Sequence, residues 1–226
     1  MKLVLFDIDG TLVDCGGQTR RPFAAALEAV YGTAGDLPGY DFSGKTDPRI
    51  VLDLMTGAGL ARELVLERLA AVRDHYLAEL EATLEPARVR RLPAVVERLE
   101  ELAARGDVAV GLLTGNWERG ARIKLGSCGL SGFFRFGAFG DDSIDRDELP
   151  PVALERALAA VGRRFAPAET LIVGDSPLDV ACARAHGIRC LAVATGWTSP
   201  ERLAAAGAAR VVADLAGGDL AELLAA

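Results

Sequence analysis

The sequence predicts an α/β protein with a doubly wound, Rossmann-like parallel sheet that carries an inserted, all-helical unit. Two patterns support this expectation. Short, continuous apolar runs alternate with helical patterns along most of the chain, as is typical of parallel strands buried on both faces. One long stretch after the first run shows helical patterns alone, which indicates an insertion directly after the first strand. A length of 226 residues accommodates one domain with such an insertion.

Five apolar runs are expected to form the strands, because each is continuous and ends at a polar or glycine-rich turn. They are Lys2–Phe6, Val108–Leu113, Thr170–Val173, Cys190–Val193 and Val211–Ala213. Helices are expected over Leu92–Arg105 and Pro150–Val161, each with a proline near its start. The Ala-rich tail is expected to form a final helix.

The insertion is predicted to span residues 16–86, which leaves residues 1–15 and 87–226 as the core. Its helical patterns cover Arg21–Tyr31, Asp47–Met55 and Arg62–Leu84. We expect it to act as a cap that opens and closes over the core. Its hinges would be Gly16-Gly17 and Thr83–Arg88, although the two glycines would serve an ordinary turn equally well.

One segment of the insertion, Gly39–Thr46, matches the phosphate-binding P-loop pattern letter for letter. A P-loop follows a buried strand, and Ala34–Pro38 does not have the composition of one, so we exclude nucleotide binding by this segment. Lys45, Thr46 and Arg49 are candidates for contacts with substrate. The alternative, to which we give equal weight, is a solvated helix start.

Composition excludes several classes of partner. The net charge of −7 argues against a nucleic-acid groove or an anionic membrane surface. The first apolar run ends at Asp7, far short of a secretory leader or a membrane span, so a cytoplasmic protein is expected. The four cysteines lack zinc-ligand spacing and are expected to be reduced thiols. Only Cys15, just after an acidic cluster, is a candidate for a reactive role.

The acidic cluster consists of Asp7 and Asp9 at the end of the first strand, followed by Gly10-Thr11. Side chains at positions i and i+2 of an extended segment point to the same side. Two carboxylates in such a place repel each other unless a cation or a proton intervenes. A Mg²⁺ ion, which binds carboxylate, carbonyl and phosphate oxygens, accounts for the pair. The alternative is a plain acidic turn.

Two further turns are chemically suggestive. Thr114-Gly115-Asn116 offers a hydroxyl and backbone N–H groups for a phosphate, or is only a turn and helix cap. Asp175 would complete the metal ligands with Asp179 supporting it, or the pair would only cap a helix. All three turns follow strands, and the carboxyl ends of parallel strands share one edge of the sheet, so we expect them to converge.

Three segments resemble motifs I, II and IV of the haloacid dehalogenase-like superfamily in order and spacing: Asp7–Thr11, Thr114–Asn116 and Gly174–Asp179. The predicted insertion lies where that family carries a helical cap of the C1 type. Val193–Gly196 also resembles the phosphoglycolate phosphatase-like branch.

The resemblance implies that Asp7 attacks phosphorus to give an aspartyl-phosphate, which water then hydrolyses. It implies that Asp9 protonates the leaving oxygen and then activates the water. It also implies that Mg²⁺, held by Asp7, Asp9 and Asp175, neutralises the crowded carboxylates and the phosphoryl group.

Motif III of the family is usually a lysine before a helix rich in Pro and Leu, and this sequence departs from it. Arg146 occupies that place, and its guanidinium can bind phosphate in a bidentate manner. Lys124 is the fallback if its helix turns it inward. The alternative for Arg146 is pairing with its acidic neighbours on the surface. We favour Arg146 by analogy of position.

The expected function is Mg²⁺-dependent hydrolysis of a small phosphorylated metabolite, of the phosphoglycolate or sugar-phosphate class, by a monomer or homodimer. A phosphomutase of the β-phosphoglucomutase type is the alternative on the same site. A dehalogenase is disfavoured because carbon–halogen chemistry does not need the general acid Asp9. A catalytically silent phosphate-binding module is disfavoured because Asp7, Asp9, Thr114 and Asp175 are all present.

Overall fold

The computed structural model describes residues 1–217 and contains a six-stranded, fully parallel sheet in the order β5-β4-β1-β6-β7-β8. The strands are β1 (Lys2–Phe6), β4 (Val108–Leu113), β5 (Gly137–Ala138), β6 (Thr170–Gly174), β7 (Arg189–Val193) and β8 (Arg210–Val212). The predicted doubly wound sheet is confirmed. The helix predicted for the Ala-rich tail falls largely on residues 218–226, outside the described range.

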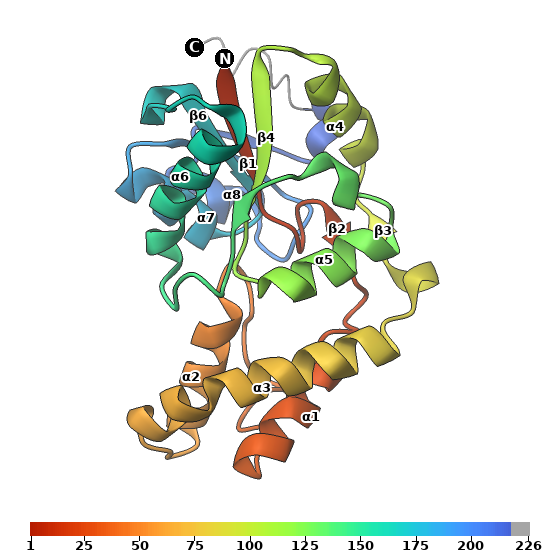
Figure 1. Cartoon of the computed structure of the whole chain (residues 1–226), viewed down its shortest axis with the longest axis vertical. Helices are drawn as coiled ribbons and strands as arrows, with labels where there is room; N and C mark the ends of the chain where they lie inside the picture. Colours follow the sequence, from red (N-terminus) through yellow and green to blue (C-terminus); the bar gives the residue numbers. More distant parts are fainter. Residues whose placement is uncertain (218–226) are drawn as a thin grey trace.

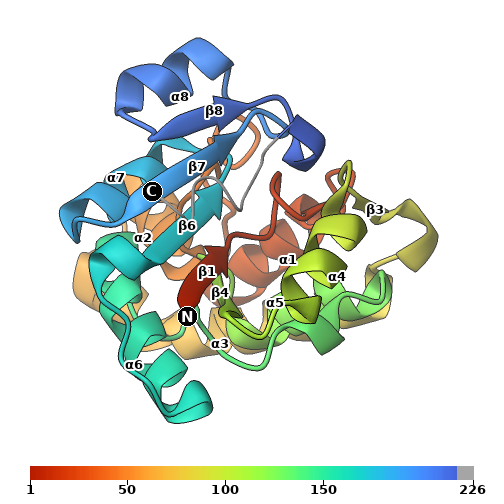
Figure 2. The same ribbon diagram turned by 90° about the horizontal axis from the view of Figure 1, so that it is seen from above.

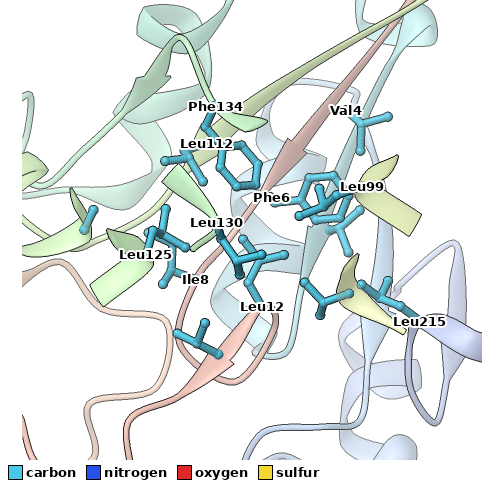
Figure 3. Packing of buried hydrophobic residues seen from close by; sticks show 14 of the residues in the cluster. Val4, Phe6, Ile8, Leu12, Leu99, Leu112, Leu125, Leu130, Phe134 and Leu215 are labelled. Atoms are coloured by element: carbon cyan, nitrogen blue, oxygen red, sulfur yellow. The ribbon is translucent and has the colours of Figure 1, made fainter. Parts of the chain in front are cut away.

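Helices cover both faces of the sheet: α4 (Val95–Ala104), α5 (Glu118–Ser127), α6 (Leu149–Val161), α7 (Pro177–Ala185) and α8 (Pro200–Ala206). Successive residues of a strand point to opposite faces, and β1 shows the consequence. Val4 and Phe6 belong to one hydrophobic cluster with residues of α4 and α5, and Figure 3 shows Phe6 next to Leu99 of α4. Leu3 and Leu5 lie in a separate cluster with residues of α6, α7 and α8. Both faces of the central strand are therefore dry.

The predicted insertion contains three helices, α1 (Arg20–Tyr31), α2 (Asp47–Gly57) and α3 (Arg62–Thr83). They form a unit that lies beyond the carboxyl ends of β1 and β4, apart from the sheet in Figure 1. Its hydrophobic core also includes Trp117, from the start of α5. Two short strands, β2 (Val13–Asp14) and β3 (Arg90–Arg91), pair antiparallel where the chain leaves and re-enters the sheet domain. The view in Figure 2 places this unit behind the sheet.

The structure also contains elements that the sequence did not reveal. Strand β5 is two residues long, and so are β2 and β3, too short for a detectable apolar run. Helix α4 begins at Val95 rather than Leu92, because Ala94 adopts a left-handed conformation with φ of 58°. Within the described residues, no helix combines the length and apolarity that crossing a bilayer requires.

Candidate active site

Three polar turns meet at the carboxyl edge of the sheet. Asp7 directly follows β1, Thr114 follows β4 and Asp175 follows β6, and these three strands are neighbours in the sheet. The three residues are buried, with exposed fractions of 5%, 0% and 4%. The expected convergence of turns more than 160 residues apart is therefore present, because the strand order of a parallel sheet brings them together.

Asp7, Asp175 and Asp179 form a buried acidic cluster, with one carboxylate oxygen of each within 4.8 Å of the others. Burial raises the pKa of Asp7 to about 7, with Asp179 and Asp9 adding to the rise and Arg146 opposing it. Burial, followed by repulsion from Asp179 and Asp7, raises the pKa of Asp175 to about 9. Three carboxylates beside one guanidinium can all be ionised at neutral pH only if a further positive charge is present. A hard divalent cation fits this set of oxygen donors.

The chain leaves room for Asp175 by means of two glycines. A Cβ atom at Gly10 or Gly196 would overlap the Asp175 carboxylate. The turn that contains Gly10 and the segment that contains Gly196 are connected by a hydrogen bond, in which the Thr195 hydroxyl donates to the Gly10 carbonyl at 2.5 Å. Thr11 donates to Oδ1 of Asp175 at 3.4 Å. The first acidic turn and the segment after β7 thus enclose the acidic cluster from two sides.

Arg146 lies inside the site rather than on the surface. It is 7% exposed and stands in a short 3₁₀ turn, Arg146–Glu148, that precedes α6. Its Nη2 donates to Oδ1 of Asp7 at 3.1 Å and to Oδ1 of Asp179 at 2.5 Å. Burial alone would lower the pKa of Arg146, but the Asp179 and Asp7 carboxylates outweigh it and raise that pKa above its usual range. The guanidinium therefore stays charged.

Lys124 also points into the site, but toward a different carboxylate. Its Nζ donates to Oδ2 of Asp9 at 2.6 Å and to Oδ1 of Asn116 at 2.5 Å. Asn116 in turn donates to Oδ2 of Asp9 at 2.9 Å and to the Thr114 hydroxyl at 2.8 Å. Arg146 therefore pairs with Asp7, whereas Lys124 pairs with Asp9.

The Asp9 side chain is 44% exposed, unlike the neighbouring carboxylates. Its carboxylate is not a member of the acidic cluster found among residues 1–217. Its role as a metal ligand, and the roles of Gly115 and Asn116 in binding phosphate, remain predictions.

The loop before α2 is docked on the turn that follows β4. The backbone N–H of Asp47 donates to the Gly115 carbonyl at 2.7 Å, and a Cβ atom at Gly115 would overlap the Lys45 carbonyl. The Asp47 carboxylate accepts from the backbone N–H of Trp117 at 2.8 Å. The Gly44 carbonyl accepts from Nη1 of Arg146 at 3.0 Å. The helical unit thus contacts the site through a docking loop of residues 44–47, whose last residue is also the first residue of α2.

The three candidate substrate residues, Lys45, Thr46 and Arg49, all have partners within the protein. Thr46 donates to the Ile144 carbonyl at 2.5 Å and caps α2 by accepting from the Arg49 N–H. Arg49 forms an ion pair with Asp145. The ammonium group of Lys45 lies 3.9 Å from the centre of the Tyr40 ring. Their predicted contacts with substrate stay untested. The segment Gly39–Thr46 has no strand before it, as expected for a chance match to the P-loop pattern.

Sequence reasoning missed Asp47 and Gly44. The only signal for Asp47 was an acidic residue at the start of a predicted helix, and such a residue usually acts locally. Gly44 contributes a backbone carbonyl, which no side-chain pattern reveals. Cys15 is buried, and burial, with a further rise from Asp9, raises the pKa of its thiol to about 12, which disfavours the thiolate form on which the predicted reactive role depends.

Comparisons with known proteins agree with this geometry. A family model described as haloacid dehalogenase-like hydrolase matches residues 4–184. The phosphoglycolate phosphatase of Yersinia pestis is 32% identical over 206 residues, covering 89% of this chain and 84% of the relative. Phosphoglycolate phosphatase 1 of Pseudomonas aeruginosa is 29% identical over 212 residues, covering 90% of this chain and 73% of the relative.

The fold is shared with solved structures as well. A haloacid dehalogenase-like hydrolase from Bacteroides fragilis matches with a TM-score of 0.72 at 22% identity, covering 95% of this chain and 97% of that one. The chain therefore belongs to the haloacid dehalogenase-like hydrolase family, and within it to the phosphatases.

Proposed function

We propose that this phosphatase hydrolyses a small phosphate monoester, of the phosphoglycolate or sugar-phosphate class, through an aspartyl-phosphate on Asp7. The observation that carries the proposal is the pairing of a buried Asp7 with the more exposed Asp9, two residues further on, at the carboxyl edge of the sheet. A nucleophilic carboxylate is more reactive in a site that excludes water and holds a cation in place. A residue that transfers a proton must instead be accessible to the leaving group.

In the first step, a carboxylate oxygen of Asp7 attacks phosphorus while the bond from phosphorus to the ester oxygen breaks. Asp9 gives its proton to that departing oxygen. In the second step, a water molecule attacks phosphorus and gives a proton to Asp9, and the bond from phosphorus to Asp7 breaks. Inorganic phosphate leaves, and both aspartates return to their initial states.

Mg²⁺ is the proposed cofactor, held by Asp7 and Asp175 with Asp179 supporting. Asp9 is the remaining predicted ligand, and it would bind through its backbone carbonyl, which keeps its carboxylate free for proton transfer. When bound, the ion would offset the charge of the carboxylates and of the phosphoryl group. Asp179 is fully buried, and it accepts hydrogen bonds from Arg146 and from the Ser176 N–H. These contacts support its assignment as a residue that orients its neighbours.

Arg146 is the proposed motif III cation. Its Nε is the one buried side-chain nitrogen or oxygen in residues 1–217 that lacks a hydrogen-bond partner. An unpartnered buried donor beside the nucleophile supports a role in binding a phosphate oxygen. Thr114 and the backbone of Gly115 and Asn116 would bind the same group from the neighbouring strand.

The helical unit of residues 16–86 is proposed to be the cap, because its docking loop contacts both Arg146 and the turn after β4. A cap over the site would select small substrates and exclude bulk water.

The experiment is a screen of small phosphate esters, including phosphoglycolate and sugar phosphates, with Mg²⁺ present or removed by a chelator. Mg²⁺-dependent release of inorganic phosphate is expected, with Asp7→Asn as the inactive control. Accumulation of an isomeric sugar phosphate without phosphate release would instead indicate a phosphomutase. If Mg²⁺ shifts the unfolding temperature but no ester turns over, the chain is a phosphate-binding module.

A further inference from the structure

Lys124 is a fully enclosed cation on the inner face of α5, with 3% of its surface exposed. Burying an ammonium group is costly unless charged and polar partners compensate for the lost water. Here the compensation comes from Asp9 and Asn116, which accept its hydrogen bonds at 2.6 and 2.5 Å. Arg146 already supplies a cation to Asp7. Lys124 is therefore a second cation whose partner is the predicted proton carrier.

The hydrogen bonds to Asp9 are distributed unevenly over its two oxygens. Both Lys124 and Asn116 donate to Oδ2, at 2.6 and 2.9 Å. The contact recorded for Oδ1 is a weak one, with the Cys15 thiol at 3.9 Å. Two strong donors on one oxygen fix the plane of the carboxylate and leave the other oxygen available. The 44% exposure of this side chain means that a substrate can reach it.

Two further sets of hydrogen bonds fix the position of Lys124, one through Asn116 and one at the start of α5. Asn116 connects Lys124 to the Thr114 hydroxyl, next to the predicted phosphate seat. The start of α5 is held by the Asp47 carboxylate, which accepts from the Trp117 N–H. A rigid support of this kind is what a precisely oriented catalytic group requires.

We propose that Lys124 is a positioning residue for proton transfer: together with Asn116 it holds Oδ2 of Asp9 and leaves Oδ1 to exchange the proton with the leaving oxygen. This inference rests on the proposed function. In the first step the proton passes from Oδ1 to the departing ester oxygen. In the second step Oδ1 takes a proton from the attacking water. Lys124 itself neither gains nor loses a proton.

The test compares two phosphate esters in the full-length protein with Mg²⁺. An alkyl phosphate has a poor leaving group that needs a proton, whereas p-nitrophenyl phosphate has a good one that does not. Lys124→Met should lower kcat/KM on the alkyl phosphate by about 100-fold, since misplacing a reacting group has effects of that size. The loss of kcat/KM on p-nitrophenyl phosphate should be far smaller, because kcat/KM covers only substrate binding and the first step. The second step, hydrolysis of the aspartyl-phosphate, is common to both esters and should slow equally for both.

The matched control is Arg122→Met, which removes a cation from the same helix outside the site, where Arg122 donates to the Phe134 carbonyl. It should leave the ratio of kcat/KM for the two esters unchanged. In an Asp9→Ala background, Lys124→Met should have no further effect on alkyl phosphate turnover, because its partner is already gone. If Lys124→Met does not fold, Lys124→Gln keeps a donor without the charge and is compared in the same way.

An equal loss of kcat/KM on both esters, or a full additional loss in the Asp9→Ala background, would overturn the inference and leave Lys124 with a purely structural role. Failure of the proposed function looks different: the wild-type protein would release phosphate from neither ester, and both proposals would fall.

Discussion

Asp7 is the residue on which the proposed chemistry depends most directly. Asp7→Asn keeps the size of the side chain and removes the attacking oxygen anion. We expect kcat on any phosphate ester to fall by more than about 1,000-fold, as for other nucleophile replacements. Mass spectrometry of acid-quenched enzyme should detect one added phosphoryl group on the wild type and none on the variant. A phosphorylated Asp7→Asn protein would contradict the nucleophile assignment.

Arg146 is expected to stabilise the folded site in addition to its proposed role in binding phosphate. Its guanidinium bridges the buried carboxylates of Asp7 and Asp179, and it reaches the Gly44 carbonyl of the docking loop. Arg146→Met would leave two buried carboxylates without their cation, and removal of one partner from such a pair costs about 3–5 kcal/mol.

Denaturant unfolding in the absence of metal measures this loss for Arg146→Met. Arg146→Lys is the control, because lysine keeps the positive charge but lacks the planar guanidinium that donates to Asp7, Asp179 and the Gly44 carbonyl at once. It should recover part of the stability and little of the activity. Equal stability of the wild type and Arg146→Met would show that the observed bridges contribute nothing.

Between the helical unit and the sheet, the docking loop of residues 44–47 is the decisive element. Gly44 has φ of 68°, and a Cβ atom there would overlap the Ser176 hydroxyl. Gly44→Ala should therefore push the loop off the site. Gly32→Ala is the matched control, since Gly32 has φ of 76° but no atom within 4 Å of the added carbon.

Both alanine variants should lose about 1–2 kcal/mol of stability from the left-handed backbone. Only Gly44→Ala should also lower kcat/KM, by about 10- to 100-fold, because the loop and Arg146 are displaced together. Steady-state kinetics beside thermal unfolding separates the two effects. Equal kcat/KM for Gly44→Ala and Gly32→Ala would show that the placement of the docking loop does not affect catalysis.

The contact between α2 and the start of α5 should make stability depend on pH. Burial raises the pKa of Asp47 from 3.8 to about 7, although Lys124 and the Trp117 N–H oppose the rise. A raised pKa means that the folded state favours the protonated form. The contribution of this group to stability is therefore complete below pH 3.8 and is lost as the pH rises through about 7.

Asp47→Asn keeps an acceptor and cannot ionise, so it should gain stability relative to the wild type between about pH 5 and about pH 8. Urea unfolding of both proteins at these two pH values measures the change. If the wild type and Asp47→Asn differ in free energy of unfolding by the same amount at both pH values, Asp47 does not titrate in this range.

At the scale of the whole molecule, Mg²⁺ should stabilise the folded chain, because the acidic cluster exists only after β1 and β6 are paired. Mg²⁺ at about 100 times its Kd should add about 2.7 kcal/mol, and a chelator should reverse the effect. Asp175→Asn should abolish most of this gain, whereas Asp74→Asn on the exposed surface should not. Equal Mg²⁺ stabilisation of both variants would place the metal elsewhere.

Much of the fold was predictable because its signals are local. The five long strands and the helices of the insertion follow from runs of apolar residues and from their periodicity, and both are set within a few neighbouring positions. Strand β5 escaped prediction because two residues carry no pattern. The start of α4 was misplaced because the left-handed backbone of Ala94 is decided by its surroundings.

The candidate site divides in the same way. Asp7, Asp9, Thr114 and Asp175 were identifiable as individual residues, because each follows an apolar run in a recognisable short motif. Their meeting place follows from the rule that parallel strands end at one edge. No local pattern could assign Arg146 to Asp7 and Lys124 to Asp9, because these pairings join segments more than 100 residues apart.

By itself, therefore, the sequence determined the class of fold, the helical insertion and the acidic residues of the candidate site. Only the tertiary structure decided how the cations are shared, that Gly44 and Asp47 dock the helical unit on the site, and that the Cys15 thiol is buried. The physical reason is distance: apolar periodicity and turn chemistry act between neighbours in the chain. Charge pairing and desolvation depend instead on which distant segments the folded chain brings into contact.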